Sequence, residues 1–175
     1  MDELDFPPDS NLPNHGNRQS MDWITDQIAI GDCLDAFNRA ADVDSILCLL
    51  SDCCGERSDI DGCCIPLLDG SGNERKTVLA AVDFIAEQVE KGLKVLVHCQ
   101  AGRSRSVCIV AAYLMRHQGL SRMQAISMIS KKRHIYLSDG VDEIFKHIRD
   151  EDSIALSSLS ERLRNFLHRS LLGKR

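Results

Sequence analysis

Apolar and polar positions along the 175-residue chain alternate between short strand-like runs and longer stretches with helical spacing. From Val78 to Val89, for example, apolar residues recur every three or four positions, as on one face of a helix. Strands that alternate with helices are typical of an α/β domain with a central, mainly parallel sheet flanked by helices. We expect strands in 23–30, where two short apolar segments pair, and in 43–50, 60–67 and 93–97.

Short polar side chains mark the starts of the expected helices, because they can accept the free amide hydrogens of a first turn. Ser121 and Gln124 form the pattern of a capping box. The helix that follows residues 98–106 and runs to His117 is apolar on nearly all sides, which places it in the core. The expected caps of the other helices are Asp32, Asn73 and Asp139, and Gly92 ends the helix that Asn73 opens.

The two ends of the chain differ from its middle in composition. Residues 1–20 contain three of the four prolines and show no apolar period, so we expect a flexible leader. Residues 21–150 carry the alternating pattern and are expected to form one domain. Residues 151–175 are expected to form an amphipathic helix packed on this domain, with docking to a partner as the alternative. Its apolar side would carry Leu156, Leu159, Leu163, Phe166 and Leu167.

The formal net charge of −5 argues against a nucleic-acid partner, which a basic surface would hold. The charge is uneven, however, because residues 91–138 contain nine Lys and Arg residues and no Asp or Glu. The longest apolar run, 107–115, is far shorter than the roughly 18 residues that a membrane-spanning helix needs. We therefore expect no membrane span, and a locally positive site within an acidic protein.

Eight cysteines could indicate a disulfide scaffold, but the chain is long for one and lacks the pattern of a signal peptide. A reducing compartment is therefore expected, the cytoplasm or alternatively the nucleus. Cys53–Cys54 and Cys63–Cys64 are adjacent pairs, and no two cysteines have the Cys-x-x-Cys spacing of many metal sites. We expect no bound metal.

The segment that starts at His98 carries the candidate chemistry, because a strand ending in His98 and Cys99 turns through a short loop into the apolar helix. A sulfur at a helix N-terminus lies beside free amides and the helix dipole, which favour the thiolate. The same amides form a nest for an anion, Gly102 lets the backbone curl around it, and Arg105 can present two donors to a phosphate. The expected anion cradle consists of Gln100, Ala101, Gly102, Arg103, Ser104 and Arg105.

The order His-Cys, five residues, then Arg-Ser resembles the signature of the cysteine-dependent protein tyrosine phosphatase superfamily. The longer match, with Ala101-Gly102 in the loop and Ala112–Met115 in the helix, is similar to the dual-specificity branch. The resemblance covers residues 23–149 and implies a protein tyrosine phosphatase-like fold, with the catalytic domain in 21–150. It also implies hydrolysis of phosphotyrosine and phosphoserine or phosphothreonine in protein substrates, without a metal or organic cofactor.

The resemblance implies a role for each matching residue. Cys99 matches the nucleophile that forms a phosphocysteine intermediate, and Arg105 matches the residue that holds the equatorial phosphate oxygens. Ser106 matches the hydroxyl that assists the thiolate as a leaving group, and His98 is similar to the histidine that organises the loop. The family places a general acid some thirty residues before the nucleophile, and Asp69 has this spacing.

Some positions leave alternatives or depart from the family pattern. Asp83 is a poorer general acid than Asp69, because it falls within an expected helix. Where the family usually has Arg-Pro, this chain has Arg133-His134, and Ser138-Asp139 replaces a later Pro-Asn pair. The departures concern the support of the loop, where Asp139 would stand in for an asparagine, and not the nucleophile.

Other functions are compatible with the same residues. A pseudophosphatase would bind phosphoproteins without turnover, a related phosphatase would act on phosphoinositides or RNA 5'-phosphates, and a rhodanese-type enzyme would transfer sulfur. The retention of Cys99, Arg105 and Ser106 favours a phosphatase. A reactive Cys99 could also be oxidised and trapped as a disulfide, although buried reduced thiols are the more common state. The candidate trapping residues are Cys48, Cys53 and Cys54.

Overall fold

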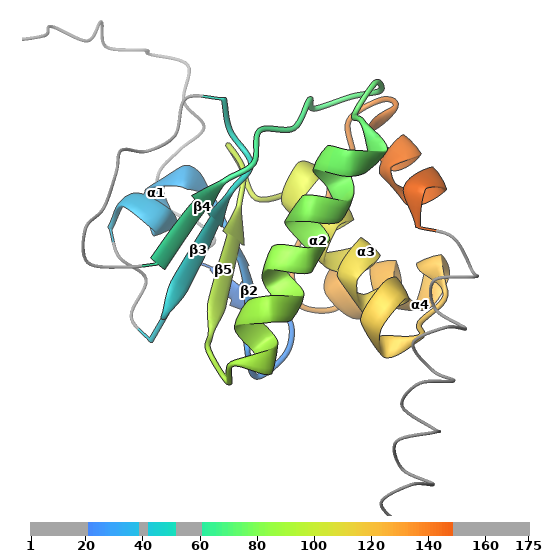
Figure 1. Ribbon diagram of the computed structural model, residues 1–175. Helices are drawn as coiled ribbons and strands as arrows, with labels where there is room; N and C mark the ends of the chain where they lie inside the picture. Colours follow the sequence, from blue (N-terminus) through green and yellow to red (C-terminus); the bar gives the residue numbers. More distant parts are fainter. Residues whose placement is uncertain (1–20, 39–41, 52–60, 149–175) are drawn as a thin grey trace, which may run out of the picture.

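A five-stranded sheet forms the centre of the fold in a computed structural model that describes residues 21–38, 42–51 and 61–148 (Figure 1). The strand order is β1-β2-β5-β3-β4. β1 runs antiparallel to β2 and the remaining neighbours are parallel, which confirms the expected mainly parallel sheet. The strands are β1 (Asp22–Trp23), β2 (Ile28–Gly31), β3 (Ser45–Cys48), β4 (Asp61–Cys64) and β5 (Val95–His98).

Helices cover both faces of this sheet (Figure 1). Side chains alternate between the two faces of a strand, so Leu96 joins a small core on the α1 side, whereas Val95 and Val97 join the larger core. The larger core packs against α2, α3, α4 and a 3-10 helix, η2. The helices are α1 (Cys33–Phe37), α2 (Arg75–Glu90), α3 (Arg105–Gln118), α4 (Arg122–Ser130) and η2 (Val141–His147).

α3 lies within the larger core, as its apolar composition predicts. Every residue from Ser106 to Leu114 is buried, and the helix contacts α2, α4 and η2. Gly119, with a φ of 68°, ends it in the left-handed conformation. Because its neighbours hold α3 on all sides, its first turn has a fixed position beside the end of β5.

The starts of the helices agree only in part with expectation. Asp32 caps α1 and Ser121 caps α4, both as capping boxes, as predicted. The prediction that Asn73 caps α2 is wrong, because its side chain bonds to the loop before the helix. The Asn73 Oδ1 accepts from the Leu68 N–H at 2.8 Å, and Nδ2 donates to the carbonyls of Leu68 and Gly70, each at 3.0 Å. An Asn side chain that satisfies nearby backbone groups in this way is no longer free to cap.

The segment after α4 and the ends of two strands also differ from expectation. The helix expected to start with an Asp139 cap is the 3-10 helix η2, and the residue before it is Gly140 in the left-handed conformation, with a φ of 80°. The predicted cap at Asp139 is therefore wrong. β3 and β4 are shorter than the predicted strands because their paired ladder ends at Cys48 and Cys64.

Residues 1–20 and 151–175, with the expected leader and amphipathic helix, lie outside the described residues. Within the described part of the chain, none of the helices combines the length and the apolar character needed to cross a membrane.

Candidate active site

The cysteine loop, residues 99–104, connects the end of β5 to the start of α3. β5 lies between the parallel strands β2 and β3, and the carboxyl ends of such strands are where ligands of open α/β sheets bind. Residues that follow the neighbouring strands β3 and β2 bond to the loop and to the end of β5. The Leu49 N–H donates to the His98 carbonyl at 3.0 Å, and the Cys33 N–H donates to the Gln100 carbonyl at 3.3 Å.

Gly102 gives the loop its curvature. It has a φ of 65°, and a Cβ at this position would overlap the carbonyl oxygen of Gly31 and lie 2.6 Å from the Arg133 guanidinium. Only glycine fits this conformation and this space without strain. The backbone can therefore curl so that its amides and those of the α3 N-terminus form a nest suited to an anion.

Cys99 is 2% exposed, and its Sγ lies 3.4 Å from the Ser106 Oγ. Burial alone would raise the pKa of this thiol. Hydrogen bonds from the Ser106 hydroxyl and from the Ser106 and Gly102 amides, together with the positive charge of Arg105, outweigh burial and lower the pKa below its ordinary value. The loop therefore favours a thiolate at Cys99, the form that acts as a nucleophile.

His98 is fully buried at the end of β5. Its ring Nδ1 lies 3.4 Å from the Cys99 carbonyl oxygen, which can accept a hydrogen bond from the ring N–H. Burial lowers the pKa of His98, and the bond to Cys99 and the charge of Asp32 only partly oppose this effect. A buried, neutral imidazole in contact with backbone is suited to holding the loop in shape.

Arg105 is the first residue of α3, and its side chain is 13% exposed. Its Nη1 donates to the carbonyls of Leu49 and Leu67, at 3.4 and 3.3 Å. Its Nε is buried without a hydrogen-bond partner. Leaving a buried donor of this kind unpaired is costly, so the guanidinium is poised to bind an anion in the nest.

Asp69 lies beside the cysteine loop although thirty residues separate it from Cys99. Its Oδ1 accepts a hydrogen bond of 2.6 Å from the Ser104 hydroxyl and lies 3.7 Å from the Arg105 Nε. Ser104 in turn accepts the Ser138 N–H at 3.1 Å, so its own hydrogen can point to Asp69. The carboxylate is thus close to both the loop and Arg105, and it is partly exposed, at 42%.

The Asp69 loop, residues 68–73, is fixed from two sides. From within, the Asn73 side chain bonds to its backbone, as described above. From outside, the His147 ring donates to the Asn73 carbonyl at 2.8 Å, and the Gly72 N–H donates to Glu143 at 3.4 Å. These contacts hold the carboxylate of Asp69 next to the cysteine loop.

Arg133 is a supporting residue whose contacts the sequence did not reveal. It is 2% exposed, its Nε donates to the Gly102 carbonyl at 2.6 Å, and its Nη1 pairs with the Asp22 carboxylate at 2.7 Å. Its Nη2 reaches the Ala101 carbonyl at 3.5 Å. The match of Arg133 to the Arg of the family's Arg-Pro pair could have indicated its importance, but no motif indicated Asp22 as its partner.

The other predicted residues surround this arrangement. Gln100 and Arg103 are exposed on the loop, and the Gln100 side chain contacts the Cys33 Sγ at 3.7 Å. Cys48 is buried and pairs in register with His98, one residue before Cys99. Two other cysteines proposed for trapping, Cys53 and Cys54, lie outside the described residues. Within the residues that the structure describes, no group of three or more His, Cys, Asp or Glu side chains is placed to bind a metal.

Replacing Arg133 with methionine is expected to destabilise the fold by about 1–3 kcal/mol and to lower kcat/KM, because the Gly102 and Ala101 carbonyls lose a buried charged donor. Denaturant unfolding and steady-state kinetics measure the two effects. Arg122→Met is the matched control, because Arg122 forms an ion pair with Asp142 in which both side chains are 49% exposed. The control should change stability by less than about 1 kcal/mol. Equal effects of both substitutions would contradict a special role for Arg133.

Comparisons with known proteins agree with this geometry. Residues 25–144 match the family model described as the dual specificity phosphatase catalytic domain. Dual specificity protein phosphatase 1 of Arabidopsis thaliana is 50% identical over 54 residues, which are 31% of this chain and 27% of that protein. The chain thus matches only about a quarter of that relative's length.

Solved structures show the same fold at low sequence identity. DUSP15 is 22% identical with a TM-score of 0.67, over 83% of this chain and 96% of that chain. PTPMT1, solved in complex with PI(5)P, is 21% identical with a TM-score of 0.64, over 81% and 99% of the two chains. Because the family model covers more than half of the chain, including the cysteine loop and the Asp69 loop, this protein belongs to the dual specificity phosphatase catalytic-domain family.

Proposed function

We propose that this protein hydrolyses phosphotyrosine and phosphoserine or phosphothreonine monoesters in phosphoproteins, through a phosphocysteine at Cys99. The observation that carries the proposal is the nest at the α3 N-terminus, which holds a sulfur with a lowered pKa beside the Arg105 guanidinium, whose buried Nε has no hydrogen-bond partner. The placement of Asp69 beside the same loop supplies a proton donor within the site. A reducing compartment, the cytoplasm or nucleus, would keep Cys99 reduced.

In the first step, the Cys99 thiolate attacks phosphorus in line with the ester oxygen. The S–P bond forms as the P–O bond breaks, and Asp69 gives its proton to the departing oxygen. The loop amides and the Arg105 guanidinium hold the three remaining oxygens, whose charge is spread in the transition state. His98 keeps the loop backbone in the shape that these contacts need.

In the second step, water attacks phosphorus and Asp69 takes a proton from it. The S–P bond breaks, the electron pair returns to Cys99, and inorganic phosphate leaves. The Ser106 hydroxyl, 3.4 Å from Sγ, donates a hydrogen bond to the sulfur as its charge returns.

Replacing Ser106 with alanine is expected to slow hydrolysis of the intermediate by roughly ten- to a hundredfold, the worth of a hydrogen bond to a charged group. Pre-steady-state kinetics with an aryl phosphate should then show a burst of phenol followed by slow turnover. Ser130→Ala is the matched control, because Ser130 lies on α4 and its hydroxyl donates to the Ser127 carbonyl. Unchanged turnover without a burst in Ser106→Ala would contradict this role.

The substrate class is tested with one panel of phosphomonoesters. Phosphotyrosyl and phosphothreonyl peptides of the same sequence, phosphoinositide vesicles and RNA with a 5'-phosphate are compared by phosphate release. We expect both peptides to be hydrolysed faster than the lipid and the RNA. Preferential release from phosphoinositides would favour a phosphoinositide phosphatase, the alternative that fits the similarity in fold to PTPMT1, solved with PI(5)P. Phosphopeptide binding without release from any substrate would favour a pseudophosphatase.

A further inference from the structure

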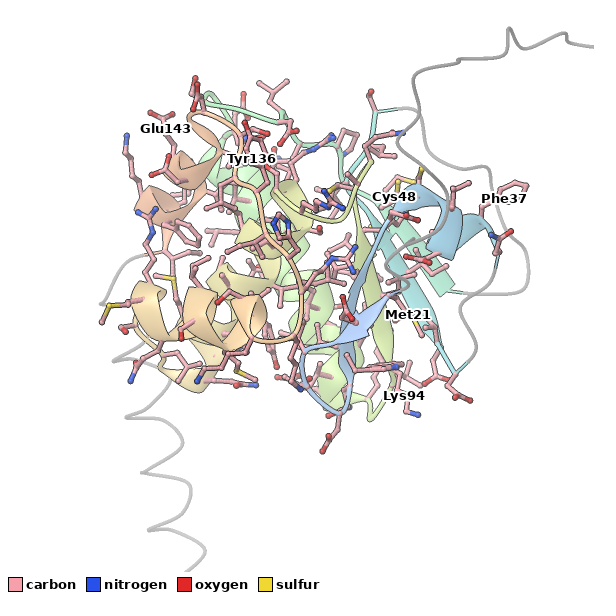
Figure 2. All side chains as sticks on the ribbon, turned by 180° about the vertical axis from the view of Figure 1, so that it is seen from behind. Met21, Phe37, Cys48, Lys94, Tyr136 and Glu143 are labelled. Carbon is pink, nitrogen blue, oxygen red and sulfur yellow. The ribbon has the colours of Figure 1, made fainter. Side chains whose placement is uncertain are left out.

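Tyr136 is an exposed aromatic residue at the edge of the cysteine loop. Its side chain is 70% exposed, among the highest values for large hydrophobic residues in the described part of the chain. Figure 2 shows Tyr136 and Lys94 at opposite ends of the molecule. Because Lys94 precedes β5 and Cys99 follows it, Tyr136 lies at the same end as Cys99. Tyr136 is therefore not part of the hydrophobic core, and packing in the core does not account for an aromatic side chain at this position.

The backbone around Tyr136 is fixed to the loop at two points. The Tyr136 N–H donates to the Arg103 carbonyl at 3.0 Å, and the Ser138 N–H donates to the Ser104 hydroxyl at 3.1 Å. The neighbouring side chains of Ile135 and Leu137 pack against the core. Tyr136 is therefore exposed between two half-buried neighbours, on a backbone that is bonded to the cysteine loop at Arg103.

Leu68 is a second exposed hydrophobic residue, and it lies on the Asp69 loop. It is 60% exposed and immediately precedes Asp69, whose carboxylate accepts the Ser104 hydroxyl. The Asp69 loop and the segment after Tyr136 touch, because a Cβ on Gly140 would lie only 2.9 Å from the Ser71 nitrogen. Two exposed hydrophobic side chains therefore belong to two touching segments, and both segments bond to residues 103–104.

We propose that Tyr136, together with Leu68, forms an apolar wall at the mouth of the site that contacts the aromatic ring of a phosphotyrosine substrate. This inference rests on the proposed function and adds a specificity-determining residue to it. With the phosphate in the nest, a phenyl ring attached to the ester oxygen must pass the rim, where an aromatic wall gives it a partner. The short aliphatic side chain of phosphothreonine offers the wall little surface.

The test compares kcat and KM of wild type, Tyr136→Ala and Tyr136→Phe for phosphotyrosyl and phosphothreonyl peptides of the same sequence. Loss of the ring should lower kcat/KM for phosphotyrosine about three- to tenfold, mainly through KM, the range expected for an aromatic pair. The phenylalanine variant should retain the wild-type value. The kcat/KM for the phosphothreonyl peptide should change less than about twofold, because phosphothreonine lacks the ring.

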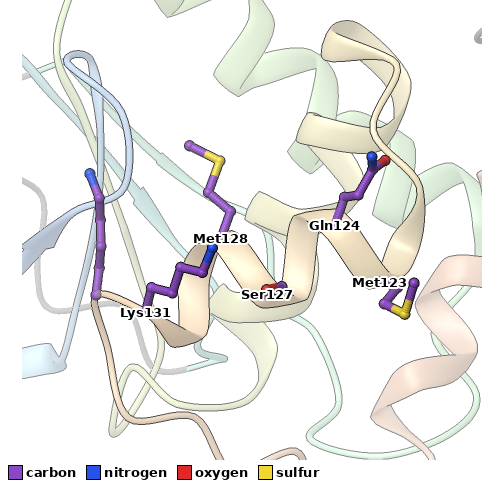
Figure 3. Close-up of a pocket in the computed structure, with 6 residues that line it drawn as sticks. Met123, Gln124, Ser127, Met128 and Lys131 are labelled. Atoms are coloured by element: carbon purple, nitrogen blue, oxygen red, sulfur yellow. The ribbon is translucent and has the colours of Figure 1, made fainter.

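Two controls separate recognition of the ring from damage to the loop. Inhibition by inorganic phosphate, which has no ring, should be the same in wild type and Tyr136→Ala. Met123→Ala, which truncates an exposed side chain (79%) lining a groove on α4 (Figure 3), should leave both peptides unaffected. Unchanged phosphotyrosine kinetics in Tyr136→Ala, or an equal loss for phosphotyrosine, phosphothreonine and inorganic phosphate, would overturn the inference alone. A wild-type protein that hydrolyses neither peptide would instead overturn the proposed function, and the inference with it.

Discussion

Cys99→Ser is expected to lose phosphomonoester turnover by roughly 10⁴-fold or more, while it still binds phosphate. A serine hydroxyl is far less ionised than a thiol whose pKa is lowered by Ser106, Gly102 and Arg105, so it cannot replace the nucleophile. The anion nest and the Arg105 guanidinium remain, so affinity for the oxyanion should persist. Hydrolysis of p-nitrophenyl phosphate measures the first expectation, and calorimetric titration with inorganic phosphate measures the second.

Cys108, on the helix α3 that follows the cysteine loop, provides the matched control. It is fully buried in α3, and burial raises the pKa of its thiol to about 12, so it stays protonated at neutral pH. Cys108→Ala should therefore keep its turnover. In the wild-type protein at pH 7, iodoacetate should alkylate Cys99 and leave Cys108 intact, and added phosphate should protect Cys99. Faster alkylation of Cys108, or turnover retained in Cys99→Ser, would contradict the assignment of the nucleophile.

Asp69→Asn is expected to lower kcat for a phosphotyrosyl peptide by roughly 10²–10³-fold, because the phenolic oxygen then leaves without a proton. A substrate with a good leaving group needs this proton less. The loss for 2,4-dinitrophenyl phosphate should therefore be within about tenfold, and the difference between the two substrates is the signature of a general acid.

Asp83→Asn is the control for this substitution. Asp83 is half exposed on α2 and pairs with Arg116 at 3.0 Å, away from the cysteine loop. The Asp83→Asn variant should keep the wild-type kcat for both the phosphotyrosyl peptide and 2,4-dinitrophenyl phosphate. If Asp69→Asn slowed both substrates equally, the carboxylate would be a structural partner of Ser104 rather than a proton donor.

The sequence was most informative where the functional residues are contiguous. The cysteine loop and Arg105 lie within one strand–loop–helix segment, so the residues themselves indicate both the local structure and an anion nest. The fold class could be predicted for a similar reason, since several elements, such as β5 and α2, show their own apolar pattern. Spacing alone predicts Asp69, and the structure places its carboxylate 2.6 Å from the Ser104 hydroxyl.

The support of the site could not be predicted, because it depends on how distant segments meet. Arg133 lies in a basic run that resembles a solvated surface, yet it is buried against Gly102 and Asp22. Asn is a residue type that often caps helices, but the Asn73 side chain forms hydrogen bonds with the backbone of the Asp69 loop instead. The exposed Tyr136 belongs to no motif, and the bond of its backbone to Arg103 places it beside the cysteine loop.

Transfer of the phosphoryl group to Cys99 is measured most directly by trapping it in the Ser106→Ala variant. Rapid acid quenching during turnover of a ³²P-labelled phosphotyrosyl peptide, followed by proteolysis and mass spectrometry, locates the labelled residue. We expect the label on the peptide that contains Cys99, as an S-phosphocysteine, in amounts that approach one per active site. Label on another residue would contradict a phosphocysteine intermediate. So would turnover by Ser106→Ala that needs Cys99 but yields no labelled protein.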